Sequence, residues 1–171
     1  MKILTISGSA RQNSQNVQFL AAFPSLFPQF DFTHDSSLKE LPLFTASIDR
    51  HPWPQKVLDW RFRMANCDAL MIVSPEYLHN LPALIKNALE WLASSGEMMH
   101  KPVLPITFTP HPPRGEKAMQ SLLWSLQALE ARIVGQLDLY QQDIHFEDGQ
   151  MRMGQESLEM LEASLVLLTG S

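Results

Sequence analysis

The sequence has only one cysteine, Cys67, among its 171 residues. A single cysteine excludes an internal disulfide and any metal site built from several cysteines, which suits a reducing compartment. Basic residues are also in the minority, with 13 lysines and arginines against 18 aspartates and glutamates and a formal net charge of −5. That balance disfavours work on nucleic-acid backbones or anionic membranes. We therefore expect a cytoplasmic protein with small-molecule partners, and neither a nucleic acid nor a membrane among them.

Long hydrophobic runs are missing as well. The apolar stretch after Met1 and Lys2 covers only residues 3–6, which is too short for a signal peptide. No run approaches the roughly 20 residues that span a bilayer. Six histidines show no paired metal-ligand spacing on one helix, so we expect no metal site. With 45% hydrophobic and 18% charged residues, the chain is typical of a globular protein, and we expect one domain over residues 1–171.

Short apolar runs alternate with longer amphipathic stretches, as expected when parallel strands are joined by crossover helices. The run at residues 69–73 is continuously apolar, which indicates a central strand covered on both faces. The expected strands are 2–7, 30–33, 68–74, 103–108 and 133–139. The expected helices are 14–23, stopped by Pro24, and then 55–66, 81–94, 116–131 and 155–168. Five such units predict an α/β, three-layer, doubly wound sandwich with a five-stranded parallel sheet in the order 2-1-3-4-5.

In such a sheet ligands bind beyond the carboxyl ends of strands one and three, which directs attention to two loops. The first, residues 7–16, reads Ser-Gly-Ser-Ala-Arg-Gln-Asn-Ser-Gln-Asn and ends at the expected start of a helix. Free N–H groups at a helix start, with hydroxyl, amide and guanidinium donors beside them, suit a phosphate. The loop is neither a nucleoside-triphosphatase loop nor a dinucleotide fingerprint, because Gly8 is its only glycine. The alternative is that Ser14 or Asn13 merely caps the helix and Arg11 is a solvated charge.

The second loop covers residues 74–82 and reads Ser-Pro-Glu-Tyr-Leu-His-Asn-Leu-Pro. Pro75 fixes the backbone and Tyr77 offers an aromatic face, so this loop predicts a rigid wall against a planar ring. The alternative is that Tyr77 packs on the fold and Pro82 simply opens the next helix.

The two loops carry an ordered pair of motifs, Gly8-Ser9-x-Arg11-x-x-Ser14-x-Asn16 and then Pro75-Glu76-Tyr77 followed by Lys86-Asn87-Ala88-x-x-Trp91. In this order they resemble the NADPH-dependent FMN reductase family of flavodoxin-like proteins. Residues 41–44, Leu-Pro-Leu-Phe, resemble that family's connection after strand two, and residues 101–103, Lys-Pro-Val, its entry to strand four. The resemblance covers most of the chain and weakens over the C-terminal third.

The resemblance also implies which residues hold the cofactor. Around the FMN phosphate it places Ser9, Arg11, Ser14, Gln15 and Asn16. Along the isoalloxazine, largely through backbone groups, it places Pro75, Glu76, Tyr77 and Leu78, and Thr107 is a further candidate near the flavin. No catalytic side chain is implied, because the cofactor carries the chemistry.

The function implied is an FMN-dependent NAD(P)H oxidoreductase. In the family, FMN accepts a hydride from NADPH or NADH, and electrons pass on to a quinone, an azo compound, a metal oxyanion or free flavin. A homodimer or homotetramer is implied as well. The alternative is a flavodoxin-like electron carrier, or an FMN-binding protein without NAD(P)H turnover. The acceptor, the choice between NADH and NADPH, and the choice between dimer and tetramer stay open.

Two positions depart from the family's pattern. The family usually has asparagine where this chain has Leu78, and Asn80 follows two residues later. After strand four the family commonly has a glycine-rich loop, whereas residues 107–115 here contain three prolines, at 110, 112 and 113, and are stiffer. We expect this loop to decide whether a nicotinamide reaches the flavin. Arg114 and His111 are candidates for a phosphate of the nicotinamide cofactor, with a solvated loop as the alternative.

Overall fold

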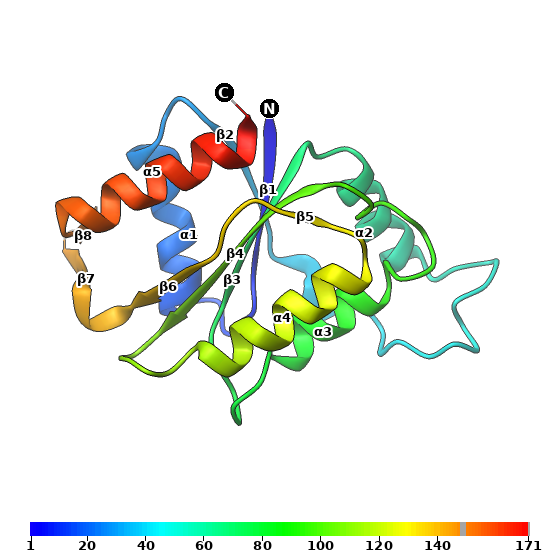
Figure 1. The fold of residues 1–171 in the computed structure, drawn as a ribbon. Coiled ribbons are helices and arrows are strands. Elements are labelled where there is room, and N and C mark those ends of the chain that lie inside the picture. Colours follow the sequence, from blue (N-terminus) through cyan, green and yellow to red (C-terminus); the bar gives the residue numbers. More distant parts are fainter. Residues whose placement is uncertain (148–149, 171) are drawn as a thin grey trace.

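A parallel sheet runs through the middle of the computed structural model, which describes residues 1–147 and 150–170 (Figure 1). Its strands are β1 (Lys2–Ser7), β2 (Asp31–Asp35), β3 (Ala69–Ser74), β4 (Pro102–Thr109), β5 (Arg132–Ile133) and β6 (Leu137–Tyr140). The strand order is β2-β1-β3-β4-β5, with β6 also paired to β4, and every pair is parallel. The structure confirms the predicted α/β fold and the order 2-1-3-4-5.

Helices cover both faces of the sheet (Figure 1). On one face lie α1 (Gln15–Leu26) and α5 (Gln155–Thr169). On the other lie α2 (Gln55–Ala65), α3 (Ala83–Glu90) and α4 (Glu116–Ala128). Two short 3₁₀ helices, η1 (Ser37–Glu40) and η2 (Gln141–Asp143), follow β2 and β6. None of the helices in the described part of the chain has the length and hydropathy needed to cross a membrane.

The central strand β3 is buried along its whole length and serves both hydrophobic cores. Leu70 and Ile72 pack in the core under α2, α3 and α4, whereas Met71 and Val73 pack in the core under α1 and α5. Successive side chains of a strand point to opposite faces, so a strand covered on both sides must be apolar at every position. This is the physical reason for the continuous apolar run in the sequence.

The expected stop of the first helix at Pro24 is wrong, because α1 continues through it to Leu26. Proline removes one backbone donor, but here it does so close to the end of the helix. The rings of Phe19 and Phe23 lie 5.0 Å apart and are both fully buried, and the N–H of Phe27 still bonds to the carbonyl of Phe23. Tertiary burial therefore holds the last turn despite the missing hydrogen bond.

The expected fifth strand, residues 133–139, is divided in two. Ile133 pairs with Val103, and the next pair is Leu137 with Ile106, so the last strand uses one residue more than β4 between the two pairs. Such an extra residue is a bulge that interrupts the ladder. Pro105, which has no N–H to donate, lies in β4 at this place.

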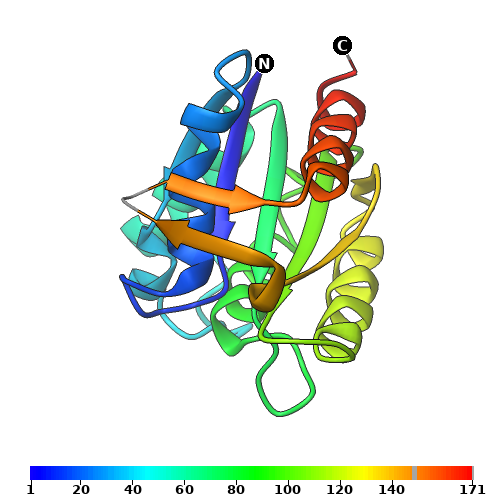
Figure 2. The ribbon, with the colours of Figure 1, turned by 90° about the vertical axis from the view of Figure 1, so that its left-hand side faces the viewer.

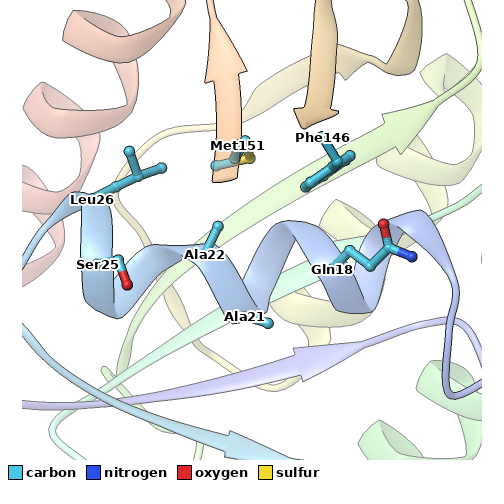
Figure 3. A pocket seen from close by; sticks show the side chains of 7 residues that line it. All are labelled: Gln18, Ala21, Ala22, Ser25, Leu26, Phe146 and Met151. Atoms are coloured by element: carbon cyan, nitrogen blue, oxygen red, sulfur yellow. The ribbon is translucent and has the colours of Figure 1, made fainter. Parts of the chain in front are cut away.

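A two-stranded antiparallel hairpin after β6 was not anticipated from the sequence. It consists of β7 (Ile144–Glu147) and β8 (Gln150–Met153), and it lies on the side of the molecule that carries α1 and α5 (Figure 2). Phe146 and Met151 of the hairpin face α1 across a cavity of about 610 Å³ (Figure 3). The hairpin thus extends the cover on that face of the sheet.

Helix α3 binds the segment at residues 41–44 through two side chains of the motif at 86–91. Asn87 Oδ1 accepts the N–H of Phe44 at 2.8 Å, and Asn87 Nδ2 donates to the carbonyl of Pro42 at 3.0 Å. Trp91 Nε1 donates to the same carbonyl at 2.8 Å. The asparagine and tryptophan of the motif therefore anchor the connection that follows β2.

We expect the substitution Asn87→Ala to lower the free energy of unfolding by about 1–3 kcal/mol, because it removes two hydrogen bonds from a partly buried backbone segment. Urea unfolding followed by far-UV circular dichroism measures this loss. The matched control is Lys86→Ala, an exposed neighbour whose surface ion pair with Glu90 contributes less than about 1 kcal/mol. An unfolding midpoint of Asn87→Ala equal to that of the control would contradict the anchoring role.

Candidate functional site

The loops after β1, β3 and β4 line a cavity of about 490 Å³ at the carboxyl end of the sheet. This end lies opposite the two chain termini (Figure 1). Eight of the ten predicted cofactor residues line the cavity, namely Ser9, Arg11, Ser14, Gln15, Asn16, Pro75, Glu76 and Tyr77. The other two, Leu78 and Thr107, are not among its lining residues. The structure therefore brings together the two loops that the sequence analysis singled out.

Gly8 joins the first loop to the second. Its N–H bonds to the carbonyl of Val73 at 2.8 Å. A Cβ atom added at Gly8 would lie 2.8 Å from Cδ1 of Ile85 and 3.0 Å from Cδ of Pro75. Only glycine allows this approach without a shift of its neighbours. The close contact sets the two loops side by side at the cavity.

Ser14 both caps helix α1 and lines the cavity. Its Oγ accepts the N–H of Val17 at 3.2 Å and so caps α1, and the residue also lines the cavity. Arg11 is exposed and forms no ion pair with any residue that the structure describes. The loop thus offers a free guanidinium and a helix start to the same cavity, which is the donor set expected for an anion.

Asn16 has one unsatisfied atom at this cavity. Its Nδ2 donates to the carbonyl of Phe108 at 3.1 Å, which orients the amide because a carbonyl oxygen can only accept. Its Oδ1 is buried and has no hydrogen-bond partner within the described chain. Buried polar atoms are almost always paired in folded proteins. The Oδ1 atom of Asn16 can therefore accept a hydrogen bond from a bound ligand.

Glu76 acts through its side chain, which the sequence analysis did not anticipate. One carboxylate oxygen, Oε2, accepts the N–H groups of Gly115, Lys117 and Ala118 at 3.1, 3.1 and 3.2 Å. These groups lie at the start of α4, where the N-cap residue Gly115 has no side chain to accept them. The other oxygen, Oε1, lies 3.4 Å from Nδ1 of His79. The loop after β3 therefore caps the helix after β4.

Thr107 lies in β4 and does not line the cavity. It is fully buried, and its hydroxyl donates to the carboxylate of Asp138. A Cβ atom at Gly115 would lie 2.7 Å from Thr107 Oγ1, and Gly115 has a φ of 110°, which strongly favours glycine. Thr107 thus packs closely against Gly115 at the start of α4.

Leu78 lies at the tip of a tight turn. Tyr77 and Asn80 exchange two backbone hydrogen bonds, of 3.1 and 3.0 Å, around Leu78 and His79. Both central residues have positive φ, 50° and 56°, as in a type I′ turn. The Leu78 side chain is 99% exposed. Asparagine, usual in the resembled family, tolerates this conformation better than leucine does.

Four further residues line the cavity, namely Phe108, Pro110, Arg114 and Gln141, and of these only Arg114 was a candidate, for a phosphate of the nicotinamide cofactor. Gln141 directly follows β6, so the rule that ligands bind beyond the carboxyl ends of strands points to it once the strand is placed. Arg114 and Pro110 belong to the proline-rich loop after β4. That loop therefore forms one wall of the cavity.

Two other cavities differ in their relation to the strand-end cavity. The one between α1 and the hairpin shares no residue with the strand-end cavity. A smaller one, of about 270 Å³, lies on the β2 side of the first loop and is also lined by Arg11. There burial lowers the pKa of His34, against the opposing effects of its hydrogen bond to Thr5 and the charge of Asp35. Burial therefore favours the neutral form of the His34 ring. No group of metal-binding side chains is found in the described ranges.

Comparison with family models matches residues 1–142 to the model described as NADPH-dependent FMN reductase. Among curated proteins, the 2-hydroxy-1,4-benzoquinone reductase of a Burkholderia species is 37% identical over 92 residues, 53% of this chain and 49% of that protein. The NADPH azoreductase of Bacillus sp. (strain OY1-2) is 25% identical over 152 residues, 88% of this chain and 82% of that protein. The chain thus spans about half the length of the Burkholderia relative.

Among solved structures, FerB from Paracoccus denitrificans, described as a flavoenzyme NAD(P)H:(acceptor) oxidoreductase, superposes with a TM-score of 0.82. The sequence identity is 20%, and the match covers 98% of this chain and 95% of that chain. This likeness establishes that the two chains share a fold.

We expect Glu76→Ala to lower the free energy of unfolding by about 1–3 kcal/mol, because three N–H groups at the start of α4 lose their acceptor. Chemical denaturation measures the change. The matched control, Glu116→Ala, removes an exposed carboxylate from the first turn of the same helix, which contributes less than about 1 kcal/mol through the helix dipole. Equal losses for the two variants would show that the Glu76 cap adds nothing specific.

Proposed function

This chain belongs to the NADPH-dependent FMN reductase family, and we propose that it works as an FMN-dependent NAD(P)H oxidoreductase. It would take a hydride from NADPH or NADH and pass electrons to a small planar acceptor. The observation that carries the proposal is the strand-end cavity, where an anion-binding loop and a rigid aromatic loop line the same space. We further propose that residues 1–171 form one domain. We also propose that the protein is cytoplasmic, because a free thiol such as that of Cys67 is typical of a reducing compartment.

The residues of the cavity fit FMN. Arg11, Ser9 and the start of α1 offer donors to its phosphate. The unpartnered Oδ1 of Asn16 needs a donor, and the ribityl hydroxyl groups of FMN are donors of the right kind. When bound, FMN would supply the hydride acceptor, so the chain itself need only bind, orient and shield. The backbone of residues 75–77 would orient the ring, and Gly8 keeps that wall close to the phosphate loop.

We propose quinones and azo compounds as the acceptors, because the relatives above are named as reductases of these compounds. Metal oxyanions and free flavin are the other acceptors that the family resemblance implied. Tyr77 is 52% exposed and borders the cavity, so a planar acceptor could stack on its ring from the solvent side.

We also propose that the protein is a homodimer or homotetramer. Trp124 on α4 is 63% exposed, and Phe62 on α2 and Met99 after α3 are exposed as well. Large apolar side chains of this kind are enriched at protein interfaces. Size-exclusion chromatography with light scattering of the wild-type protein and of Trp124→Lys tests this assignment.

We expect the wild-type protein to bind FMN at least about tenfold more tightly than riboflavin, which lacks the phosphate. Arg11→Gln should weaken FMN binding about 10- to 100-fold and leave riboflavin binding nearly unchanged, because a charge-assisted hydrogen bond contributes about 1.5–3 kcal/mol. Quenching of flavin fluorescence measures both affinities. The matched control is Arg132→Gln, an exposed arginine at the opposite, amino end of the strands. Equal affinity for both flavins would place the phosphate elsewhere.

Turnover is tested by adding NADH or NADPH anaerobically to the FMN-loaded protein and following the flavin absorbance. Bleaching by either nucleotide, and reoxidation by a quinone or an azo dye, is the expected result. Bound FMN that neither nucleotide bleaches would indicate an electron carrier or a binding protein instead. Failure to bind FMN would exclude all flavoprotein functions.

A further inference from the structure

Two guanidinium groups line the strand-end cavity, and they come from two separate loops. Its charged lining residues are Arg11 after β1, Glu76 after β3 and Arg114 after β4. The charge of Glu76 is compensated by the three N–H groups at the start of α4. Neither arginine forms an ion pair with any described residue. In a chain of net charge −5, two unpaired guanidinium groups on separate loops therefore border one cavity.

Three hydrogen bonds fix the backbone at Arg114 and Gly115. Its carbonyl accepts the hydroxyl of Thr109 at 2.8 Å, and its N–H donates to the carbonyl of His111 at 3.1 Å. The N–H of the next residue, Gly115, donates to Glu76 at 3.1 Å. These contacts place the root of the Arg114 side chain at a defined position on the cavity wall.

The start of α4 is itself unavailable to a ligand. Free N–H groups at a helix start commonly bind phosphate, but here the Glu76 carboxylate occupies them. A carboxylate in that place would also repel an anion that approached the helix directly. The guanidinium of Arg114 is therefore the cationic donor that this wall presents to an incoming anion.

We propose that Arg114 binds a phosphate group of the reduced nicotinamide dinucleotide, and that Glu76 is the positioning residue that holds the loop for it. This inference rests on the proposed oxidoreductase function, with Arg11 binding the FMN phosphate on the opposite wall. The dinucleotide brings a pyrophosphate, and NADPH a further 2′-phosphate, and a guanidinium can bind either with two parallel hydrogen bonds. The proline-rich loop is then a recognition element for the hydride donor.

The test uses the FMN-loaded protein and two fragments that lack the nicotinamide, ADP-ribose and 2′-phospho-ADP-ribose, titrated by calorimetry. We expect Arg114→Gln to weaken fragment binding about tenfold or more, and Arg114→Lys to weaken it less. A loss for both fragments assigns the pyrophosphate, and a loss for 2′-phospho-ADP-ribose alone assigns the 2′-phosphate. Glu76→Gln should weaken the same fragment by a smaller factor. FMN affinity should stay within twofold of wild type in the Arg114 variants.

Steady-state kinetics give a second readout. Arg114→Gln should raise KM for the dinucleotide about tenfold with kcat nearly unchanged, because the lost contact holds ground state and transition state alike. The control Arg132→Gln should match the wild type in every measurement. Wild-type turnover together with wild-type fragment binding by Arg114→Gln would overturn this inference and leave the oxidoreductase function standing. A loss of FMN affinity in Arg114→Gln would also overturn it, by assigning Arg114 to the FMN phosphate. A wild-type protein that no nicotinamide reduces would refute the proposed function itself.

Discussion

The carboxylate of Glu76 accepts three backbone N–H groups from the start of α4, and this contact joins the loop after β3 to the loop after β4. A further hydrogen bond, from Asn16 Nδ2 to the carbonyl of Phe108, joins the start of α1 to the end of β4. A third tie, the contact of Gly8 with Pro75, joins the loop after β1 to the loop after β3. Residues 75–76 thus contact both neighbouring walls of the cavity, the loop after β1 through Gly8 and the start of α4 through Glu76.

The sheet can place these loops because the strands that precede them, β1, β3 and β4, are buried on both faces. Leu4 and Ile6 of β1 face the core under α2, α3 and α4, and Ile3 faces the core under α1 and α5. Strands buried on both faces are held by apolar contacts throughout, so their carboxyl ends shift little relative to one another. The two cores stabilise the fold, so the polar residues of the loops are available to bind a ligand. The rigidity of the site comes from the apolar sheet beneath it.

The strands could be predicted from local signals and their order from the number of strand–helix units, whereas most of the cavity-lining residues were implied by the family resemblance. A continuous apolar run marks a buried strand, and the motif from Gly8 to Asn16 lies where β1 meets α1. The side-chain role of Glu76 could not be predicted, because its partners at residues 115–118 are brought near it only by the tertiary fold. The bulge after β5 was missed for a related reason: one extra residue opposite Pro105 changes the register but hardly changes the hydrophobic pattern.

The walls formed by the loops after β1 and after β4 differ in a way that suits a cofactor and a substrate. The loop after β1 combines a guanidinium, hydroxyl groups and the start of α1, so several donors would act on the FMN phosphate proposed to bind there. The loop after β4 offers Arg114 alone, because Glu76 has taken the N–H groups of α4. At about 1.5–3 kcal/mol for each charge-assisted hydrogen bond, several donors give long residence and a single group gives weak, reversible binding. A flavin has to stay through many turnovers, whereas a nicotinamide has to leave after each one. In the proposed reaction, Glu76 would favour that exchange, because it occupies the N–H groups at the start of α4 that could otherwise bind the dinucleotide.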